Sequence, residues 1–159
     1  MDSVRLEEVD LGLEINDQGC AMLLMDEYSC SILTVDDKID PVLIRFEGCT
    51  QVKFGYPNEE ALRGREIYGD CPHVVVEVFG SDWFDALQEQ NSIRFPDVKW
   101  ARKRHFACFF SECTGEFLAD RVHAKRIDGD FDGMAVAAMR SALALQTRGY
   151  PSLLPRREV

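Results

Sequence analysis

The sequence has no long hydrophobic run, although 46% of its 159 residues are hydrophobic. A membrane-spanning helix needs about 20 consecutive apolar residues, and this chain contains no run approaching that length. The opening residues, MDSVRLEEVD, also lack the basic region and apolar stretch that mark a secretory signal. We therefore expect a soluble, cytoplasmic protein that does not enter a membrane.

Basic residues are scarce in the first third of the chain. Residues 1–50 contain twelve acidic and three basic residues, whereas residues 51–159 contain sixteen and fifteen. The formal net charge of -10 therefore belongs almost wholly to the N-terminal third. A surface of this sign repels nucleic acid and anionic lipid. It suits a basic protein partner, and the alternative is that these acids only keep the protein soluble.

The sequence also lacks the short motifs of common catalytic and cofactor sites. It contains no G-x-S-x-G, no G-x-G-x-x-G and no G-x4-G-K-[ST], so we expect no cofactor. Paired carboxylates, such as Glu59 with Glu60 or Glu112 with Glu116, could perform acid and base chemistry if burial separated their pKa values. The simpler interpretation is that they are solvated turn residues.

Six cysteines are irregularly spaced in a chain long enough to fold without disulfides, which predicts free thiols. They are Cys20, Cys30, Cys49, Cys71, Cys108 and Cys113. Cys71 and His73 could join His105, Cys108 and Cys113 as soft zinc ligands. On a strand, however, His105 and Cys108 would point to opposite faces. We therefore expect core cysteines and surface histidines, and no metal site.

The stretch IDGDFDGMAVAAM places Asp128, Asp130 and Asp132 at alternate positions before Gly133, as at the start of a calcium loop. The bidentate acid of such a loop would fall at Met139, which cannot bind calcium, and the preceding segment is typical of a strand. We therefore expect these aspartates to cap the following helix. A divergent cation site is the alternative.

Alternating hydrophobic residues predict an antiparallel succession of strands. The expected strand segments are VDLGLEI, CAMLLM, SILTV, VLIRF, TQVKFGY, HVVVEVF, RHFACFF and EFLADRV. The segment HVVVEVF is apolar on both faces and should be central in its sheet. Ser81 should cap a short amphipathic helix over DWFDALQEQ. Gly115 should take the difficult backbone position in the hairpin between the last two strands.

Residues 133–146, GMAVAAMRSALALQ, are rich in helix-forming residues and apolar on almost every side. Such a helix needs a cover, and a curved sheet is the simplest one. The predicted fold class is therefore α+β: a curved, mainly antiparallel sheet or partial barrel of about seven or eight strands packed on a long C-terminal helix. We expect a single domain over residues 1–159, with residues 150–159 as an irregular tail.

Three segments resemble those of small bacterial proteins of unassigned function. They are FGYPNEEALRGREIYG, VEVFGSDWFDAL and KRHFACFFSECTGEFLA. Those proteins carry F-G-Y-P-N, E-A-x-x-G, a strand ending in S-x-W, and a later K-x-F followed by an E-x-x-A strand. Members of that group often carry histidines where this chain has Arg65 and residues near Ser111. The resemblance covers residues 54–119, implies a compact stand-alone domain and supplies no substrate.

Two functions fit these observations best. The favoured one is an inhibitor or immunity-like protein whose acidic N-terminal surface binds a basic partner. The residues expected on that surface are Asp26, Glu27, Asp36 and Asp37. The alternative is a small enzyme or ligand-binding protein with a pocket between the Tyr56–Tyr68 segment and the strand near His105. The residues expected at that pocket are Tyr56, Asn58, Glu59, Glu60, Arg65, Tyr68 and His105.

A third function is a nucleic-acid module that uses the basic run KWARKRH, Lys99–His105, with Trp100 stacked on a base. The acidic composition of the whole chain weighs against it. We expect this run instead to neutralise the acidic first third or to protect an edge strand.

Overall fold

The computed structural model describes residues 4–18, 21–27, 29–55 and 75–128, together with Gly133 and Val136. The described residues form nine strands and the helix α2 (Trp83–Arg94). The strands are β1 (Arg5–Glu8), β2 (Met22–Met25), β3 (Ser29–Val35), β4 (Pro41–Glu47), β5 (Gln51–Gly55), β6 (Val75–Phe79), β7 (Arg104–Phe109), β8 (Thr114–Ala119) and β9 (Arg121–Arg126).

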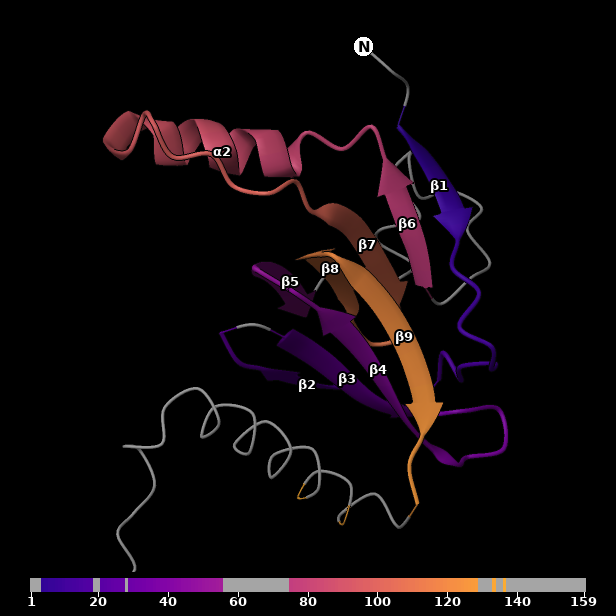
Figure 1. Cartoon of the computed structure of the whole chain (residues 1–159). Helices are drawn as coiled ribbons and strands as arrows, with labels where there is room; N and C mark the ends of the chain where they lie inside the picture. Colours follow the sequence, from indigo (N-terminus) through magenta and orange to yellow (C-terminus); the bar gives the residue numbers. More distant parts are fainter. Residues whose placement is uncertain are drawn as a thin grey trace, which may run out of the picture.

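The nine strands form two antiparallel sheets (Figure 1). The larger sheet has the strand order β1-β6-β7-β8-β5, and the smaller one has the order β2-β3-β4-β9. The β6 strand lies between β1 and β7, which confirms that the HVVVEVF segment is an interior strand. Both of its faces are covered, because alternate residues of β6 belong to the core and to a cluster on the outer face.

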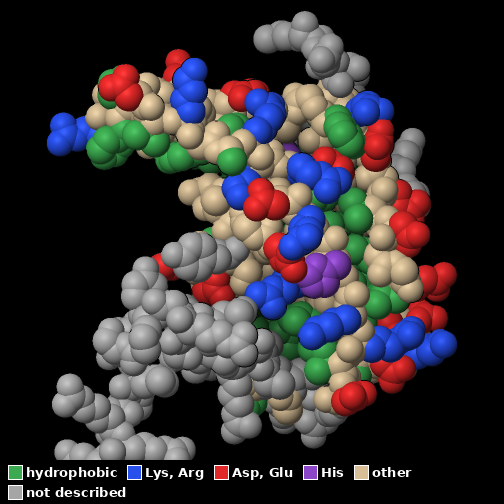
Figure 2. All heavy atoms as spheres, viewed as in Figure 1, with side chains coloured by type: hydrophobic (Ala, Val, Ile, Leu, Met, Phe, Trp, Pro, Cys, Tyr) green, Lys and Arg blue, Asp and Glu red, His purple; other side chains and the backbone are tan. Residues whose placement is uncertain are grey.

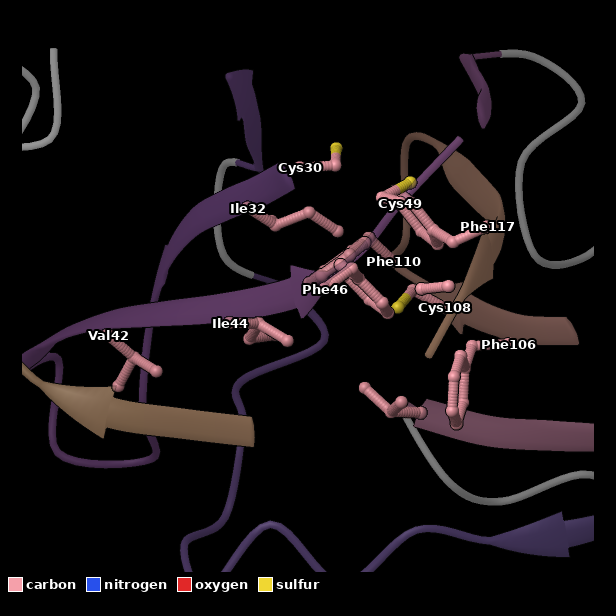
Figure 3. Close-up of a cluster of buried hydrophobic side chains, with 12 residues drawn as sticks. Cys30, Ile32, Val42, Ile44, Phe46, Cys49, Phe106, Cys108, Phe110 and Phe117 are labelled. Atoms are coloured by element: carbon pink, nitrogen blue, oxygen red, sulfur yellow. The ribbon is translucent and has the colours of Figure 1, made fainter. Parts of the chain in front are cut away.

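The hydrophobic core lies between the two sheets. Ile32, Ile44 and Phe46 from β3 and β4 are fully buried and face Phe106 and Phe117 from β7 and β8 (Figure 3). The rings of Phe46 and Phe117 stack with their centroids 3.9 Å apart and 7° between their planes. Full burial of a phenylalanine contributes about 1.5–3 kcal/mol. Each sheet therefore covers the apolar face of the other.

The chain crosses from one sheet to the other twice, and both crossings lie at the same corner. The β4 strand continues into β5 and β8 continues into β9. Glu47 therefore pairs with Arg121 in the smaller sheet, and Gln51 pairs with Leu118 in the larger one. At the corner, the amide of Asp120 donates a hydrogen bond of 2.9 Å to the carbonyl of Glu47. Strands that bend from one sheet into the next make the corners of orthogonal sheet packings.

Gly48 makes the bend of β4 into β5 at this corner. Its φ is +61°, and a Cβ atom at this position would lie 1.9 Å from Oδ2 of Asp120. That carboxylate is held by the ammonium of Lys103 at 2.7 Å. Glycine is required here because it accepts the positive φ and leaves room for the ion pair.

The predicted curved sheet or partial barrel around a C-terminal helix is wrong. The bend at the corner brings the apolar faces of two separate sheets together, so strands cover strands. Val136, a described residue of the expected helix, is 45% exposed and is not enclosed by strands. The remaining residues of 134–146, the tail 150–159, and Asp130 and Asp132 lie outside the described residues.

Helix α2 forms over the predicted segment. Its N-cap residue is Asp82 and not the predicted Ser81, but the Ser81 hydroxyl accepts a hydrogen bond of 3.2 Å from the amide of Trp83. Phe84 is buried, and the helix projects from the end of the larger sheet where β6 leaves it (Figure 1). Among the described residues, no helix has the length and apolar character to cross a bilayer.

The hairpin between β7 and β8 is confirmed, but Gly115 is not its turn residue. A hydrogen bond of 2.9 Å from the Phe110 amide to the Cys113 carbonyl closes the turn, and Gly115 lies inside β8. A Cβ atom on Gly115 would lie 2.7 Å from the ring of Phe117. Glycine therefore serves the packing of this core ring rather than an unusual backbone angle.

Replacing Gly48 with alanine should destabilise the fold by about 1–3 kcal/mol, because alanine resists positive φ and its methyl group would displace the Asp120 carboxylate. Urea unfolding measures the change. Gly12→Ala is the matched control, since Gly12 has φ +71° but no atom lies within 4 Å of its would-be Cβ. Equal losses in the two variants would contradict the steric role of Gly48.

Candidate functional site

A cluster of polar and aromatic side chains lies on the outer face of the larger sheet, at the start of α2. We call it the His105 cluster, and its members are Lys53 from β5, Ser81 and Trp83 from the β6–α2 junction, His105 from β7, and Glu116 from β8. His105 and Glu116 point outward because their neighbours Phe106 and Phe117 point into the core. Lys53 pairs directly with Glu116 across β5 and β8.

His105 contacts a different partner through each ring nitrogen. Its Nδ1 lies 2.8 Å from the Ser81 hydroxyl, and its Nε2 lies 3.1 Å from Oε2 of Glu116. The second contact is mainly electrostatic, because it lacks the alignment of a hydrogen bond. The ammonium of Lys53 lies 3.5 Å from Glu116 and 3.8 Å from the ring centroid of Trp83. Trp83 and His105 meet edge to face at 5.1 Å.

The side chains of His105 and Glu116 are largely removed from solvent. The side chain of His105 is 7% exposed and that of Glu116 is 18% exposed, so the expectation of a surface histidine is wrong for His105. The contact with His105 lowers the pKa of Glu116, and Lys53 lowers it further, while burial acts in the opposite direction. Glu116 is therefore held as a carboxylate next to the imidazole ring.

The contacts favour one tautomer for the neutral ring. If Nε2 carries the proton, it faces the Glu116 carboxylate, and Nδ1 can accept the hydroxyl proton of Ser81. Ser81 also accepts the Trp83 amide at 3.2 Å. A hydroxyl, an imidazole and a carboxylate in this sequence can activate the hydroxyl oxygen as a nucleophile.

Sequence reasoning predicted His105 at a pocket but missed Ser81, Trp83, Lys53 and Glu116 as its partners. Ser81 lies 24 positions before His105 and is not in a G-x-S-x-G motif. Strand pairing brings these residues together, and pairing was not predictable in that detail. The only signal was the presence of S-x-W and E-x-x-A in the segments that resemble the small bacterial proteins.

A pocket of about 270 Å³ adjoins Ser81 and His105. Its other lining residues are Glu77, Val78, Phe79, Gly80, Phe84, Arg102, Lys103, Arg104 and Leu118. The lining residues include Arg102, Lys103, Arg104 and His105 from the basic run. The pocket lining therefore combines apolar residues, basic residues and the histidine.

The basic run is neutralised by acids from the later part of the chain. Arg102 forms a bidentate pair with Asp85, Lys103 pairs with Asp120, and Arg104 pairs with Glu77. None of these acids belongs to the first third, and β7 is an interior strand. Neither expectation for this run, neutralising the first third or protecting an edge strand, is therefore correct. Its ion pairs also leave less charge for binding phosphate.

A second concave surface, which we call the acidic groove, lies between the segment after β1 and the β3–β4 turn. Its volume is about 580 Å³. The residues that line it are Glu8, Val9, Asp10, Leu11, Gly12, Leu13, Glu14, Ile15, Asp37 and Val75. Four of these residues are acidic, and none of the described lining residues is basic.

The four acids predicted on a partner surface have different environments. Glu27 and Asp37 are exposed, and Asp37 lines the acidic groove. Asp26 accepts hydrogen bonds from the amide and hydroxyl of Ser29, so it shapes the β2–β3 turn. Asp36 is fully buried, where it cannot meet a partner.

Asp36 holds the β3–β4 turn together. It accepts hydrogen bonds of 2.9 Å from the amides of Lys38 and Asp40 and one of 2.6 Å from Arg126 on β9. Burial raises the pKa of Asp36, but these hydrogen bonds outweigh it and hold the pKa below its usual range. The carboxylate therefore has a structural role within the fold.

The other predicted site residues, apart from His105, lie outside the described residues. They are Tyr56, Asn58, Glu59, Glu60, Arg65 and Tyr68. Among the cysteines, Cys30, Cys49 and Cys108 are buried free thiols, as predicted, and burial raises the pKa of Cys108. Cys108 faces the core while His105 faces outward, which confirms that these two side chains diverge. Cys20 and Cys71 lie outside the described residues.

Comparison of the chain with protein-family models, with curated proteins and with solved structures found no match. The function must therefore be argued from the two concave surfaces and the side chains that line them.

Replacing Glu116 with glutamine should lower the free energy of unfolding at neutral pH by about 1 kcal/mol, and the difference from the wild type should disappear in acid. The pKa of Glu116 in the folded protein lies below its ordinary value of 4.5. Its contribution is therefore complete above that value and is lost as the pH falls through the folded pKa. Urea unfolding between about pH 6 and pH 3 should show a steeper loss in the wild type than in Glu116→Gln.

The exposed Glu112, on the β7–β8 turn, provides the control for this measurement. Glu112→Gln should keep the wild-type dependence of stability on pH. The same slope in the wild type and in Glu116→Gln would show that the contacts of Glu116 with His105 and Lys53 do not stabilise the fold.

Proposed function

We propose that this protein binds a basic partner protein through its acidic groove, as an inhibitor or immunity-like protein does. The observation that carries the proposal is the convergence of Glu8, Asp10, Glu14 and Asp37 on one concave surface of about 580 Å³. A concave surface of one charge sign attracts the opposite charge during approach and discriminates against partners of like charge.

The segment that carries three of these acids is anchored to the core by its apolar residues. Val9, Leu11, Leu13 and Ile15 pack against the core between the sheets, at alternate positions along the segment. Glu8 precedes Val9, Asp10 and Glu14 lie between these apolar residues, and all three acids are exposed. The apolar side chains therefore hold the segment against the core, while its exposed carboxylates line the groove.

Backbone hydrogen bonds fix both ends of this segment. The amide of Val9 donates to the carbonyl of Val75 at 3.1 Å, and the amide of Asn16 donates to the carbonyl of Val35 at 3.0 Å. The second bond brings the segment against the end of β3, next to Asp37. A groove held in this way loses little conformational freedom on binding, which favours affinity.

The lining of the groove indicates the chemistry of the partner. The acidic residues share the groove lining with the partly buried Val9, Leu11, Leu13 and Ile15, so the groove suits lysine or arginine side chains flanked by apolar residues. Figure 2 shows acidic side chains gathered along the edge of the molecule that carries β1 and the segment after it. The groove volume falls within the usual range for binding pockets, about 300–1,000 Å³.

Neutralising the groove should weaken binding of a basic ligand by about tenfold or more at low salt. The test variant combines Glu8→Gln, Asp10→Asn, Glu14→Gln and Asp37→Asn. The probe is a fluorescently labelled octalysine peptide, whose binding is measured by anisotropy at several salt concentrations. An oligoglutamate peptide of equal length should not bind the wild type.

A second variant with the same change of charge provides the control. It combines Glu89→Gln, Asp97→Asn, Glu112→Gln and Asp128→Asn, all at exposed positions away from the groove. This variant should retain most of the wild-type affinity. Equal losses in the two variants would mean that the peptide responds only to net charge, and the groove would then not be the binding site.

A further inference from the structure

We propose that Ser81 and His105 form a catalytic pair, positioned by Glu116, that hydrolyses small carboxylic esters in the adjoining pocket. The inference is independent of the acidic groove, because the two surfaces are lined by different residues. It rests on the geometry of the His105 cluster, on the local structure around Ser81 and on the size and lining of the pocket.

Ser81 stands where a nucleophile can be presented. It follows Gly80, whose φ of +74° lets the chain turn sharply from β6 toward α2. The Ser81 side chain lines the pocket and is partly exposed, so a substrate can reach its oxygen. Hydrolases commonly hold a nucleophilic serine between a strand and a helix at such a turn.

His105 is placed to act as the base. Its Nδ1 lies 2.8 Å from the Ser81 oxygen, within the range for proton transfer. Glu116, 3.1 Å from Nε2, favours the tautomer that leaves Nδ1 able to accept the proton and then stabilises the imidazolium. The two ring nitrogens have the opposite partners from those in chymotrypsin-type enzymes, but the roles depend on geometry and not on which nitrogen is used.

The surroundings of the ring restrict its movement. His105 is 7% exposed, and the Trp83 ring meets it edge to face. Lys53 lies over Trp83 and also contacts Glu116, so it links the two neighbours of the imidazole. A base held in one orientation avoids reorganisation during the reaction.

The start of α2 supplies hydrogen-bond donors near the reacting oxygen. The Trp83 amide already donates to the Ser81 oxygen at 3.2 Å, so the positive end of the helix lies beside the nucleophile. The first amides of a helix have no partner within the helix. Together with the helix dipole, they can stabilise the negative charge that develops on an acyl oxygen.

The pocket limits the substrate to a small ester. Its volume of about 270 Å³ is at the lower end of the range for ligand pockets, about 300–1,000 Å³. Val78, Phe84 and Leu118 provide apolar surface for a short acyl group. The basic lining residues Arg102, Lys103 and Arg104 are already paired with acids, which leaves the ester carbonyl as the group to be recognised.

The reaction balances with water as the only co-substrate. The Ser81 oxygen bonds to the acyl carbon while its proton passes to Nδ1 of His105, and the bond to the leaving alcohol breaks as that alcohol takes the proton. Water then attacks the acyl-serine, giving a proton to His105. The carboxylic acid leaves, and the proton returns to Ser81.

A fluorophosphonate reagent should label Ser81 in the folded full-length chain. Labelling is detected as one added phosphonyl group by intact mass spectrometry, and peptide mapping identifies the residue. The label should be absent in Ser81→Ala and in wild-type protein unfolded in urea. Ser92→Ala is the matched control, because Ser92 lies on α2 and bonds to Gln88 outside the cluster. It should be labelled like the wild type.

Hydrolysis of p-nitrophenyl acetate provides the second readout. Ser81→Ala and His105→Gln should reduce kcat/KM by on the order of 10²-fold or more, down to the background rate. Glu116→Gln should lower kcat with little change in KM, and Glu116→Asp should recover part of it. Thermal unfolding of each variant separates loss of activity from loss of the fold.

Two results would overturn the proposal. One is a folded wild-type chain that takes up no label and hydrolyses the ester at the background rate. The other is labelling or hydrolysis that persists in folded Ser81→Ala. Either result would mean that Ser81 only accepts a hydrogen bond at the start of α2, and that His105 only makes a structural contact with Glu116. Neither result bears on peptide binding in the acidic groove.

Discussion

The contact between the two sheets is the constraint on which the rest of the structure depends. The stacked rings of Phe46 and Phe117 come from different sheets, and the sheets reach each other because the chain bends at Gly48 and Asp120. With the inner faces used for the core, His105 on β7 and Glu116 on β8 lie on the outer face. The alternation along β7 and β8 thus creates the core and the His105 cluster together.

The β6 strand connects the two concave surfaces. Its first residue, Val75, lines the acidic groove, whereas its C-terminal end leads into Ser81 at the smaller pocket. The two surfaces also differ in charge. The charged residues that line the groove are all acidic, whereas the basic residues at the pocket are matched by Asp85, Asp120 and Glu77. One strand therefore separates an acidic surface from a nearly neutral one.

Local patterns predicted most of the local structure, although residues 9–15, VDLGLEI, form no strand beyond an isolated bridge at Ile15. The alternating residues 104–110 predicted the strand β7, and the segment after Ser81 predicted the helix α2. Both predictions succeeded because the signals for these elements come from neighbouring residues along the chain. The partial barrel was wrong because no local signal identifies which surface covers which. Similarly, the spacing of aspartates did not distinguish buried Asp36 from exposed Asp37. The partners of His105 were missed because they depend on the pairing of β5, β6, β7 and β8.

The bend that carries β4 into β5 and β8 into β9 also determines how the protein must fold. Thr50 and Leu118, which meet at this corner, are 68 positions apart in the chain. Neither sheet can be completed until this long loop has closed, so the entropy of loop closure is lost before the strand pairing is gained. The two sheets should therefore form in one cooperative and comparatively slow step, since a fragment ending before β8 would leave each of them without a strand.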